Sequence, residues 1–430
     1  MACVARRLRS RGAIPLGCAL AALWAAPANA ESGTHLFTAD AFELSGDVRL
    51  VAVDGEKSWV DGGFGKLRSG SDGEFRLQPQ LGNVSLVWKP QFTWSLGAIV
   101  VGSLQGGQRT EAGLSQAYLT YRPMRSDKVA FSARAGLMWP PVSLEHEGAD
   151  WHVKDSITPS AINSWIGEEV RPVAAEGTLS ANFGAHVLRA TAAAMAANDT
   201  AGTLLTFRGW VLHDRTTLAF LRQPLPPLDS EVAGYQAAFT HPLIDLHRGF
   251  AHRPGYYAKL SWQLPVPVRV ELFRYDNRAN PEDVNDDLEW GWRTSFNHVG
   301  AVVELGSGAQ LKLQAMQGRT RMGFIDEGES RRWVDNRFRS AFLLFTRPFG
   351  PFALTGRIDA FDTRNRGSDV DGEYDEHGWS AMLAGKREWG RVTGLVELLH
   401  VWSDTPAREH SGERPRQGQT QVQAELRMHW

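Results

Sequence analysis

Polar and apolar residues alternate along most of the chain, and the pattern is clearest at the C-terminal end. Every second position in residues 422–430 is apolar, namely Val422, Ala424, Leu426, Met428 and Trp430. The residues between them are glutamine, glutamate, arginine and histidine. Alternation with a period of two predicts a strand with one apolar and one polar face. We therefore predict that residues 418–430 form an amphipathic strand that ends in an aromatic residue.

The same alternation recurs through the chain and predicts sixteen strands of roughly 9–13 residues, long enough to cross an apolar layer of about 25 Å at a tilt. In the second strand the apolar parity slips near Gly82 and Asn83, which predicts a bulge. The predicted strands are residues 42–53, 75–88, 92–104, 114–122, 129–139, 170–181, 185–196, 256–263, 268–275, 294–305, 310–318, 337–346, 352–363, 377–386, 391–403 and 418–430.

Two further segments, residues 203–213 and 232–240, alternate more weakly. Counting both as strands would give eighteen strands and keep the number even. It would also require a long turn over residues 214–230, on the side where the other turns are short. Sixteen strands are therefore favoured, with eighteen as the alternative.

The connections between the predicted strands alternate between short turns and long loops. This pattern is typical of membrane barrels, which have short periplasmic turns at one end and long extracellular loops at the other. Closure of the sheet removes the free edges that a membrane-spanning sheet cannot leave unpaired. No apolar run after residue 30 approaches the ~20 residues that a membrane-spanning helix needs. We expect an all-β fold in which residues 31–430 form one transmembrane antiparallel β-barrel.

The first 30 residues have the features of a secretory signal peptide. An apolar run over residues 13–24 follows a cluster of arginines, and a small-x-small cleavage motif ends at Ala30. Both cysteines, Cys3 and Cys18, lie in this segment. The mature chain, expected to begin at Glu31, therefore has no thiol and no disulfide.

The polar faces of the predicted strands carry many charges, which cannot lie in a dry core unless they are paired. A sixteen-stranded barrel is wide enough for a water-filled lumen, where these charges would contact water. The mature chain has 46 − 4 = 42 basic and 48 acidic residues, a net charge of −6. This balance gives no support to nucleic-acid binding, which needs a basic surface. The arginines expected to line the lumen are Arg49, Arg76, Arg122, Arg134, Arg189, Arg269, Arg357 and Arg427.

The signal peptide, the alternating strands and the C-terminal Trp430 together resemble Gram-negative outer-membrane porins, in the general sixteen-stranded type and in the phosphate-selective type. The resemblance implies that the third long loop, residues 140–169, folds into the lumen and forms its constriction. It also implies that Trp430 belongs to an assembly signal read by the barrel-assembly machinery, and that the barrel can be a homotrimer. The lysine-rich third loop expected of phosphate-selective porins is absent, so phosphate selectivity is not expected. The acidic residues of the loop are Glu145, Glu147, Asp150, Asp155, Glu168 and Glu169.

An acidic loop opposite a wall of arginines would create a transverse field that favours polar solutes. Residues 160–169 are expected to form a short helical turn against the inner wall, and the long loop of residues 198–254 is a second candidate to fill the lumen. We expect a channel in the lipid of the Gram-negative outer membrane for passive diffusion of small hydrophilic solutes, with a weak cation preference.

The sequence contains no Gly-x-Ser-x-Gly, His-Glu-x-x-His or complete P-loop motif, so neither enzyme activity nor a cofactor or metal is expected. The alternative function is a non-conducting barrel with a structural or adhesive role, or with a hydrolase site at its rim.

Overall fold

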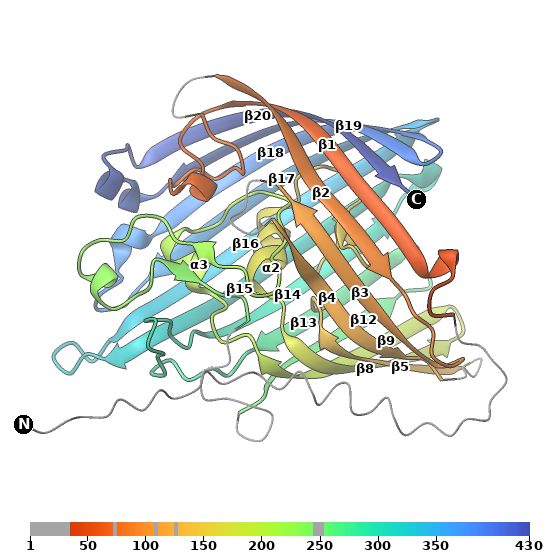
Figure 1. The fold of residues 1–430 in the computed structure, drawn as a ribbon, viewed down its shortest axis with the longest axis horizontal. Helices are drawn as coiled ribbons and strands as arrows, with labels where there is room; N and C mark the ends of the chain where they lie inside the picture. The colour runs from red at the N-terminus through yellow and green to blue at the C-terminus, as the bar shows by residue number, and fades with distance from the viewer. Residues whose placement is uncertain (1–34, 72–74, 107–110, 124–127, 244–252) are drawn as a thin grey trace, which may run out of the picture. The chain divides into compact units, whose positions relative to one another are not determined.

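The computed structural model describes residues 35–71, 75–106, 111–123, 128–243 and 253–430. The predicted signal peptide, residues 1–30, lies outside the described residues. Within these residues, sixteen antiparallel strands form one closed barrel (Figure 1). The predicted fold class and the preferred number of strands are confirmed.

Each barrel strand pairs with its neighbours along the chain, and the last strand pairs with the first. The strands are β1 (Phe42–Asp54), β2 (Arg76–Trp88), β3 (Leu96–Gln105), β4 (Ala112–Tyr121), β5 (Val129–Leu137), β8 (Val173–Phe183), β9 (His186–Ala197), β12 (Gly255–Gln263), β13 (Val268–Asp276), β14 (Arg293–Glu304), β15 (Gln310–Ile325), β16 (Arg332–Phe349), β17 (Phe352–Asn365), β18 (Glu376–Trp389), β19 (Val392–Asp404) and β20 (Arg416–His429).

The remaining elements lie in the connections between barrel strands. Two short pairs of strands are β6 (His146–Glu147) with β7 (His152–Val153), and β10 (Gln223–Pro224) with β11 (Phe239–Thr240). The α-helices are α2 (Ala161–Glu169) and α3 (Thr203–Phe207). The 3-10 helices are η2 (Ala39–Ala41), η3 (Trp59–Asp61), η4 (Val232–Gly234), η5 (Gly306–Gly308), η6 (Gly372–Tyr374) and η7 (Pro406–Ser411). Among the described residues, no helix has both the length and the apolar character needed to cross a membrane.

The barrel closes where β1 pairs with β20, in a register that runs from Ser45 opposite His429 to Asp54 opposite Thr420. One residue beyond β20, Trp430 exchanges two backbone hydrogen bonds with Leu44, of 2.8 and 3.2 Å. The predicted C-terminal strand is therefore the closing strand of the sheet.

The predicted bulge in the second strand is confirmed. The pairing of β1 with β2 jumps from Gly46–Val84 to Val48–Leu81, so that two residues of β2 lie opposite Asp47. The backbone N–H of Asn83 donates to Oδ2 of Asp47 at 3.0 Å. A Cβ atom on Gly82 would lie 1.7 Å from Oδ1 of Asp47, so only glycine fits beside this carboxylate.

Some predicted boundaries are wrong. Residues 92–95 form a turn, because the N–H groups of Phe92 and Thr93 both donate to the carbonyl oxygen of Leu96. At the opposite end of the barrel, β15 and β16 extend well beyond the predicted residues 310–318 and 337–346. The outward positions just beyond residue 318 of β15 are Arg319 and Arg321, so the apolar alternation that marked the predicted segment stops there.

The eighteen-strand alternative is wrong. Residues 203–207 form α3 and residues 232–234 form η4. Of the two predicted extra strands, only Phe239–Thr240 forms a short strand, and Leu212 makes a single parallel bridge with Leu67. The weak alternation of residues 203–213 arises from a segment that is buried on all sides, so tertiary packing decides its conformation.

The outward face of the barrel is apolar along the middle of the strands, as predicted. In β16, for example, the outward-facing Leu343 and Phe345 are exposed. The inward face was predicted to be polar, but the inward-facing Phe342 and Leu344 of the same strand are apolar and buried. The lumen therefore contains packed apolar side chains in addition to charged ones.

Candidate functional site

The loop between β5 and β8, residues 138–172, runs inside the barrel and carries α2 (Figure 1). All nine residues of this helix are buried. Its N-cap is Ser160, whose hydroxyl accepts a hydrogen bond from the backbone N–H of Asn163 at 3.3 Å. The structure thus places a short helix in the part of the loop where the sequence predicted one.

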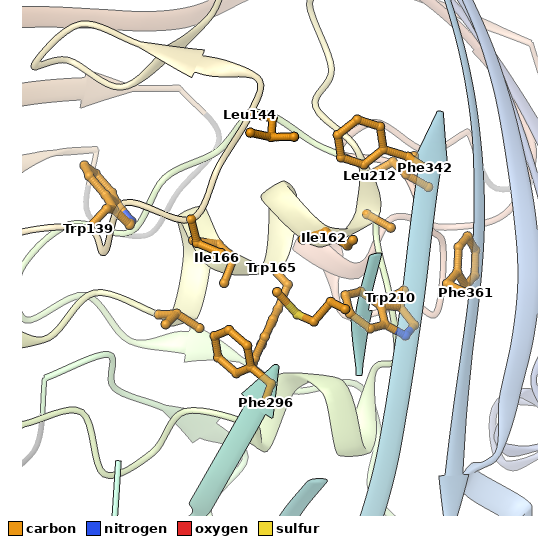
Figure 2. Packing of buried hydrophobic residues seen from close by; sticks show 14 of the residues in the cluster. Trp139, Leu144, Ile162, Trp165, Ile166, Trp210, Leu212, Phe296, Phe342 and Phe361 are labelled. Carbon is orange, nitrogen blue, oxygen red and sulfur yellow. The ribbon is translucent and has the colours of Figure 1, made fainter. Parts of the chain in front are cut away.

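Aromatic side chains dock α2 against the inner wall (Figure 2). The ring of Trp165 makes edge-to-face contacts with Phe296 of β14 and Phe338 of β16, at centroid distances of 5.4 and 5.2 Å. Trp210 packs against the same indole at 6.0 Å. Burying large aromatic side chains contributes strongly to stability, so this contact fixes the loop in the lumen.

The loop between β9 and β12 supplies the second lumenal segment, residues 198–218, which includes α3 and is almost entirely buried. The backbone N–H of Trp210 donates to Oε2 of Glu376 on β18 at 2.6 Å. The side chain of Asn336 on β16 donates to the carbonyl oxygen of Leu205 at 3.3 Å. We refer to residues 138–172 and 198–218 together as the lumen plug.

Ion pairs join the two halves of the plug. Glu168 of α2 contacts Arg208, with the shortest hydrogen bond at 2.5 Å, and His213 at 3.1 Å. Burial alone would raise the pKa of Glu168, but the cation of Arg208 and the hydrogen bond with His213 hold this pKa well below its usual range. The carboxylate is therefore charged at neutral pH and links the two loops.

Glu169, the last residue of α2, has a different environment. It accepts hydrogen bonds from the indole of Trp165 at 2.7 Å and from the backbone N–H of Leu204 at 3.1 Å. Burial raises the pKa of Glu169 to about 7, and these donors offset only part of that effect. Neither Glu168 nor Glu169 faces open water, as both are buried within the plug.

Two other predicted acidic residues connect the plug to the wall. Glu145 contacts Arg357 of β17 at 3.2 Å, and Arg357 also donates to the carbonyl oxygen of Thr158 at 2.6 Å. Asp155 contacts Lys312 of β15 at 3.2 Å and Lys386 of β18 at 3.5 Å. The sequence predicted a set of acidic loop residues and a set of lumenal arginines. Glu145 and Arg357 are the members of these two sets that form an ion pair with each other.

The remaining two predicted acidic residues lie near the β6–β7 pair. Asp150 accepts hydrogen bonds from the hydroxyl of Ser45 at 2.8 Å and contacts His152 at 3.0 Å. Glu147 pairs with Lys154 at 3.0 Å, and its side chain is 51% exposed. Glu147 is thus the member of the predicted acidic set that contacts solvent most directly.

Two further predicted arginines hold the plug against the closing seam. Arg49 of β1 contacts Asp214 of the plug at 2.7 Å and Glu425 of β20 at 2.7 Å. Arg427 of β20 donates to the carbonyl oxygen of Val153 at 2.7 Å. A cavity of about 40 Å³ lies among these residues, large enough for only a few water molecules.

The other predicted arginines do not touch the plug through an ion pair. Arg134 pairs with Glu176 on the neighbouring strand at 2.6 Å. Arg189 and Arg269 lie on the inward face nearer the short turns. Arg189 is exposed, and Arg269, 3.9 Å from Glu271, has 38% of its side chain exposed. Arg76 is the first residue of β2 and Arg122 lies just beyond β4, so both are at strand ends instead of mid-lumen.

The sequence did not indicate Arg171, a cation in the plug that is fully buried. It donates to the carbonyl oxygens of Ser115 at 2.7 Å and of Thr217, and its guanidinium lies 5.3 Å from the ring of Trp139. Burial lowers the pKa of Arg171 to about 9. No spacing or alternation marks this residue, because its partners are backbone carbonyls from distant segments.

We expect Arg357→Met to destabilise the folded barrel by about 3–5 kcal/mol, because it leaves the buried carboxylates of Glu145 and Asp359 without their common cation. The measurement is urea unfolding of the refolded barrel followed by tryptophan fluorescence. Arg347→Met, at the exposed periplasmic end of β16, is the matched control and should change stability by less than about 0.5 kcal/mol. Equal effects of the two changes would contradict the proposed wall contact.

No protein-family model matches the sequence. No curated protein matches it significantly in sequence. Solved structures do share its fold. The outer membrane channel DcaP of Acinetobacter baumannii is similar with a TM-score of 0.54 at 12% identity, over 91% of this chain and 99% of that one. The anion-selective porin from Comamonas acidovorans is similar with a TM-score of 0.52 at 12% identity, over 90% and 98% of the two chains. The chain therefore has the sixteen-stranded barrel fold of the outer-membrane porins.

Proposed function

We propose that the chain forms a water-filled channel in the outer membrane of a Gram-negative bacterium, through which small hydrophilic solutes diffuse passively. The observation that carries this proposal is the charged inner wall on the periplasmic side of the plug. There Arg189 points inward and is exposed, and Arg269, 3.9 Å from Glu271, keeps 38% of its side chain exposed. Charged side chains tolerate this position only if water fills the space beside them.

The lumen plug would restrict this channel. It crosses the lumen and is attached to the wall by contacts such as Glu145–Arg357, Asp155–Lys312 and Asp214–Arg49. In this reading the loop that carries Glu145, Glu147, Asp150, Asp155, Glu168 and Glu169 forms the constriction, and Glu147 is the carboxylate that solutes would meet most directly. Most of these carboxylates are neutralised by a partner, so solutes would meet alternating charges instead of a uniformly acidic ring.

We expect a weak cation preference. Glu147 supplies the most exposed carboxylate of the loop, and the mature chain is acidic overall. The measurement is the reversal potential of single channels in planar bilayers under a KCl gradient. Glu147→Gln should shift the potential toward anions, whereas Asp326→Asn, in the outer turn between β15 and β16, should leave it unchanged. A clear anion preference of the unaltered channel would refute the prediction.

The alternative is a barrel that does not conduct and has a structural or adhesive role. The observation in its favour is the apolar packing between plug and wall, which includes Trp165, Phe296 and Phe338. A hydrolase site at the rim receives less support. Ser143 and His146 do contact each other at 2.8 Å, but the hydroxyl of Ser143 also accepts the backbone N–H groups of two neighbouring residues, as in an ordinary turn. Absence of any single-channel current from folded protein would favour the non-conducting class.

We also propose two protein partners, further copies of the same chain and the barrel-assembly machinery. A homotrimer would fit the fold, and chemical cross-linking of the protein in its native membrane would test it. The barrel-assembly machinery would read the C-terminal strand that ends at Trp430.

A further inference from the structure

The outward face of the barrel carries a row of arginines near the extracellular ends of three neighbouring strands. Arg319 of β15 lies directly opposite Arg337 of β16, which lies directly opposite Arg364 of β17. Like charges at directly opposed positions destabilise a sheet. A sheet that keeps three arginines in one row therefore calls for a countercharge close to them.

The protein supplies that countercharge only in part. Arg319 pairs with Asp335, and Arg364 lies 3.3 Å from Asp362. Asp362 is shared, because Arg339 contacts it as well at 3.0 Å. Among the described side chains, Arg337 in the middle of the row has no hydrogen bond or ion pair. The row thus presents a free guanidinium between two cations that are already paired.

These residues line an outward-facing pocket of about 450 Å³. Six arginines and Asp362 border it, and the nearby Asp276 and Asp335 add two more negative charges. The balance of six positive and three negative charges leaves a net charge of +3. Guanidinium groups arranged in this way match the oxygens of a phosphate, which they bind through paired hydrogen bonds.

An apolar groove of about 650 Å³ adjoins the pocket on its periplasmic side. The pocket and the groove share Asn297, Gln317, Arg339 and Asp362. The floor of the groove is one cross-strand row of directly opposed residues: Val299, Ala315, Ala341, Ala360, Trp379 and Trp402. Three alanines between larger side chains leave a trough for a slender apolar group.

We propose that this outward-facing site binds a membrane lipid that carries a phosphate. The phosphate lies among Arg319, Arg337 and Arg364, and one acyl chain follows the alanine row of β15, β16 and β17. The site faces the lipid side of the barrel, where an unpaired charge is costly unless an anionic headgroup compensates it. A second copy of the chain would instead need an acidic face to match the arginines, and the apolar trough gives a free phosphate ion nothing to bind.

The test is lipid binding by the refolded full mature chain in neutral detergent, measured by native mass spectrometry. The probes are diphosphoryl lipid A, the same lipid after removal of its phosphates, and inorganic phosphate. Arg337→Gln removes the free guanidinium and should weaken binding of the diphosphoryl lipid by about tenfold. Ala341→Phe fills the trough without changing any charge and should weaken binding of the same lipid. Arg347→Gln, on the same strand near the periplasmic turn, is the matched control and should bind as the unaltered protein does.

Each result decides the proposal. Preference for the phosphorylated lipid together with loss of binding in both variants supports it. Equal binding of the two lipids, binding unaffected by Arg337→Gln, or tight binding of inorganic phosphate alone overturns it. An oligomer that dissociates on Ala341→Phe without any bound lipid also overturns it, because the occupant would then be a second copy of the chain. The assay needs no conductance, so its outcome is independent of the proposed channel function.

Discussion

A barrel in which a short glycine-serine linker replaces residues 199–217 should conduct several times more current than the unaltered protein. These residues form most of the second half of the lumen plug and are almost entirely buried. Their removal leaves α2 docked against β14 and β16 and opens the space now held by α3, Trp210 and His213. Conductance depends on the cross-section of the water-filled path, so the largest change in current follows from the largest change in lumenal volume.

The measurement is single-channel conductance in planar bilayers, with folding checked by heat-modifiable migration on gels. Replacement of residues 226–234, in the more exposed part of the same loop, is the matched control and should leave conductance close to that of the unaltered protein. If folded channels that lack residues 199–217 carried the same current as the unaltered protein, the plug would not limit the ion path. The proposed path through the lumen would then be wrong.

The plug is not expected to leave the lumen unaided. Its release would move Trp165 and Trp210 from the buried apolar cluster into water. Burial of one large apolar side chain contributes about 1.5–3 kcal/mol, and every 1.4 kcal/mol reduces the released population by about tenfold. A spontaneous opening would therefore be rare, and solute flux depends on the space that remains around the docked loops.

The sequence predicted the strands well because the two environments of a barrel wall impose a period of two. The apolar outward positions of β20, from Val422 to Met428, repeat without a break, and both the strand and its place in the sheet were found. The extracellular end of β15 was missed because its outward positions begin with Arg319 and Arg321, which interrupt the apolar alternation.

The candidate site was predictable only as a set of residue types. The polar parity of the strands placed Arg49, Arg357 and Arg427 on the inward face, where the structure has them. The partners could not be read from the sequence. Asp155 and Lys312 are 157 residues apart, and their contact depends on how the loop crosses the lumen. A solitary buried cation such as Arg171 leaves no pattern at all, because its hydrogen-bond acceptors are backbone carbonyls, which every residue carries.

Deleting Trp430 should reduce the amount of folded barrel in the outer membrane by at least about tenfold, while the refolded deletion protein should conduct normally. Trp430 lies beyond the last residue of β20 and closes the seam by exchanging two backbone hydrogen bonds with Leu44. Its deletion leaves the N–H and C=O of Leu44 unpaired at the edge of the apolar layer, where each lost bond costs several kcal/mol. No residue of the lumen plug is changed.

Two further substitutions separate the backbone effect from the aromatic signal. The side chain of Trp430 is 55% exposed and is free to be read by another protein. Trp430→Phe keeps both the backbone pair and the aromatic ring, so it should assemble normally. Trp430→Ala keeps the backbone pair alone, so poor assembly of this variant with normal refolding in detergent would assign the defect to recognition of the ring. If Trp430→Ala assembled as well as the parent and the deletion did not, loss of the closing hydrogen bonds would explain the assembly defect of the deletion. Normal assembly of all three variants would show that Trp430 is not part of the assembly signal.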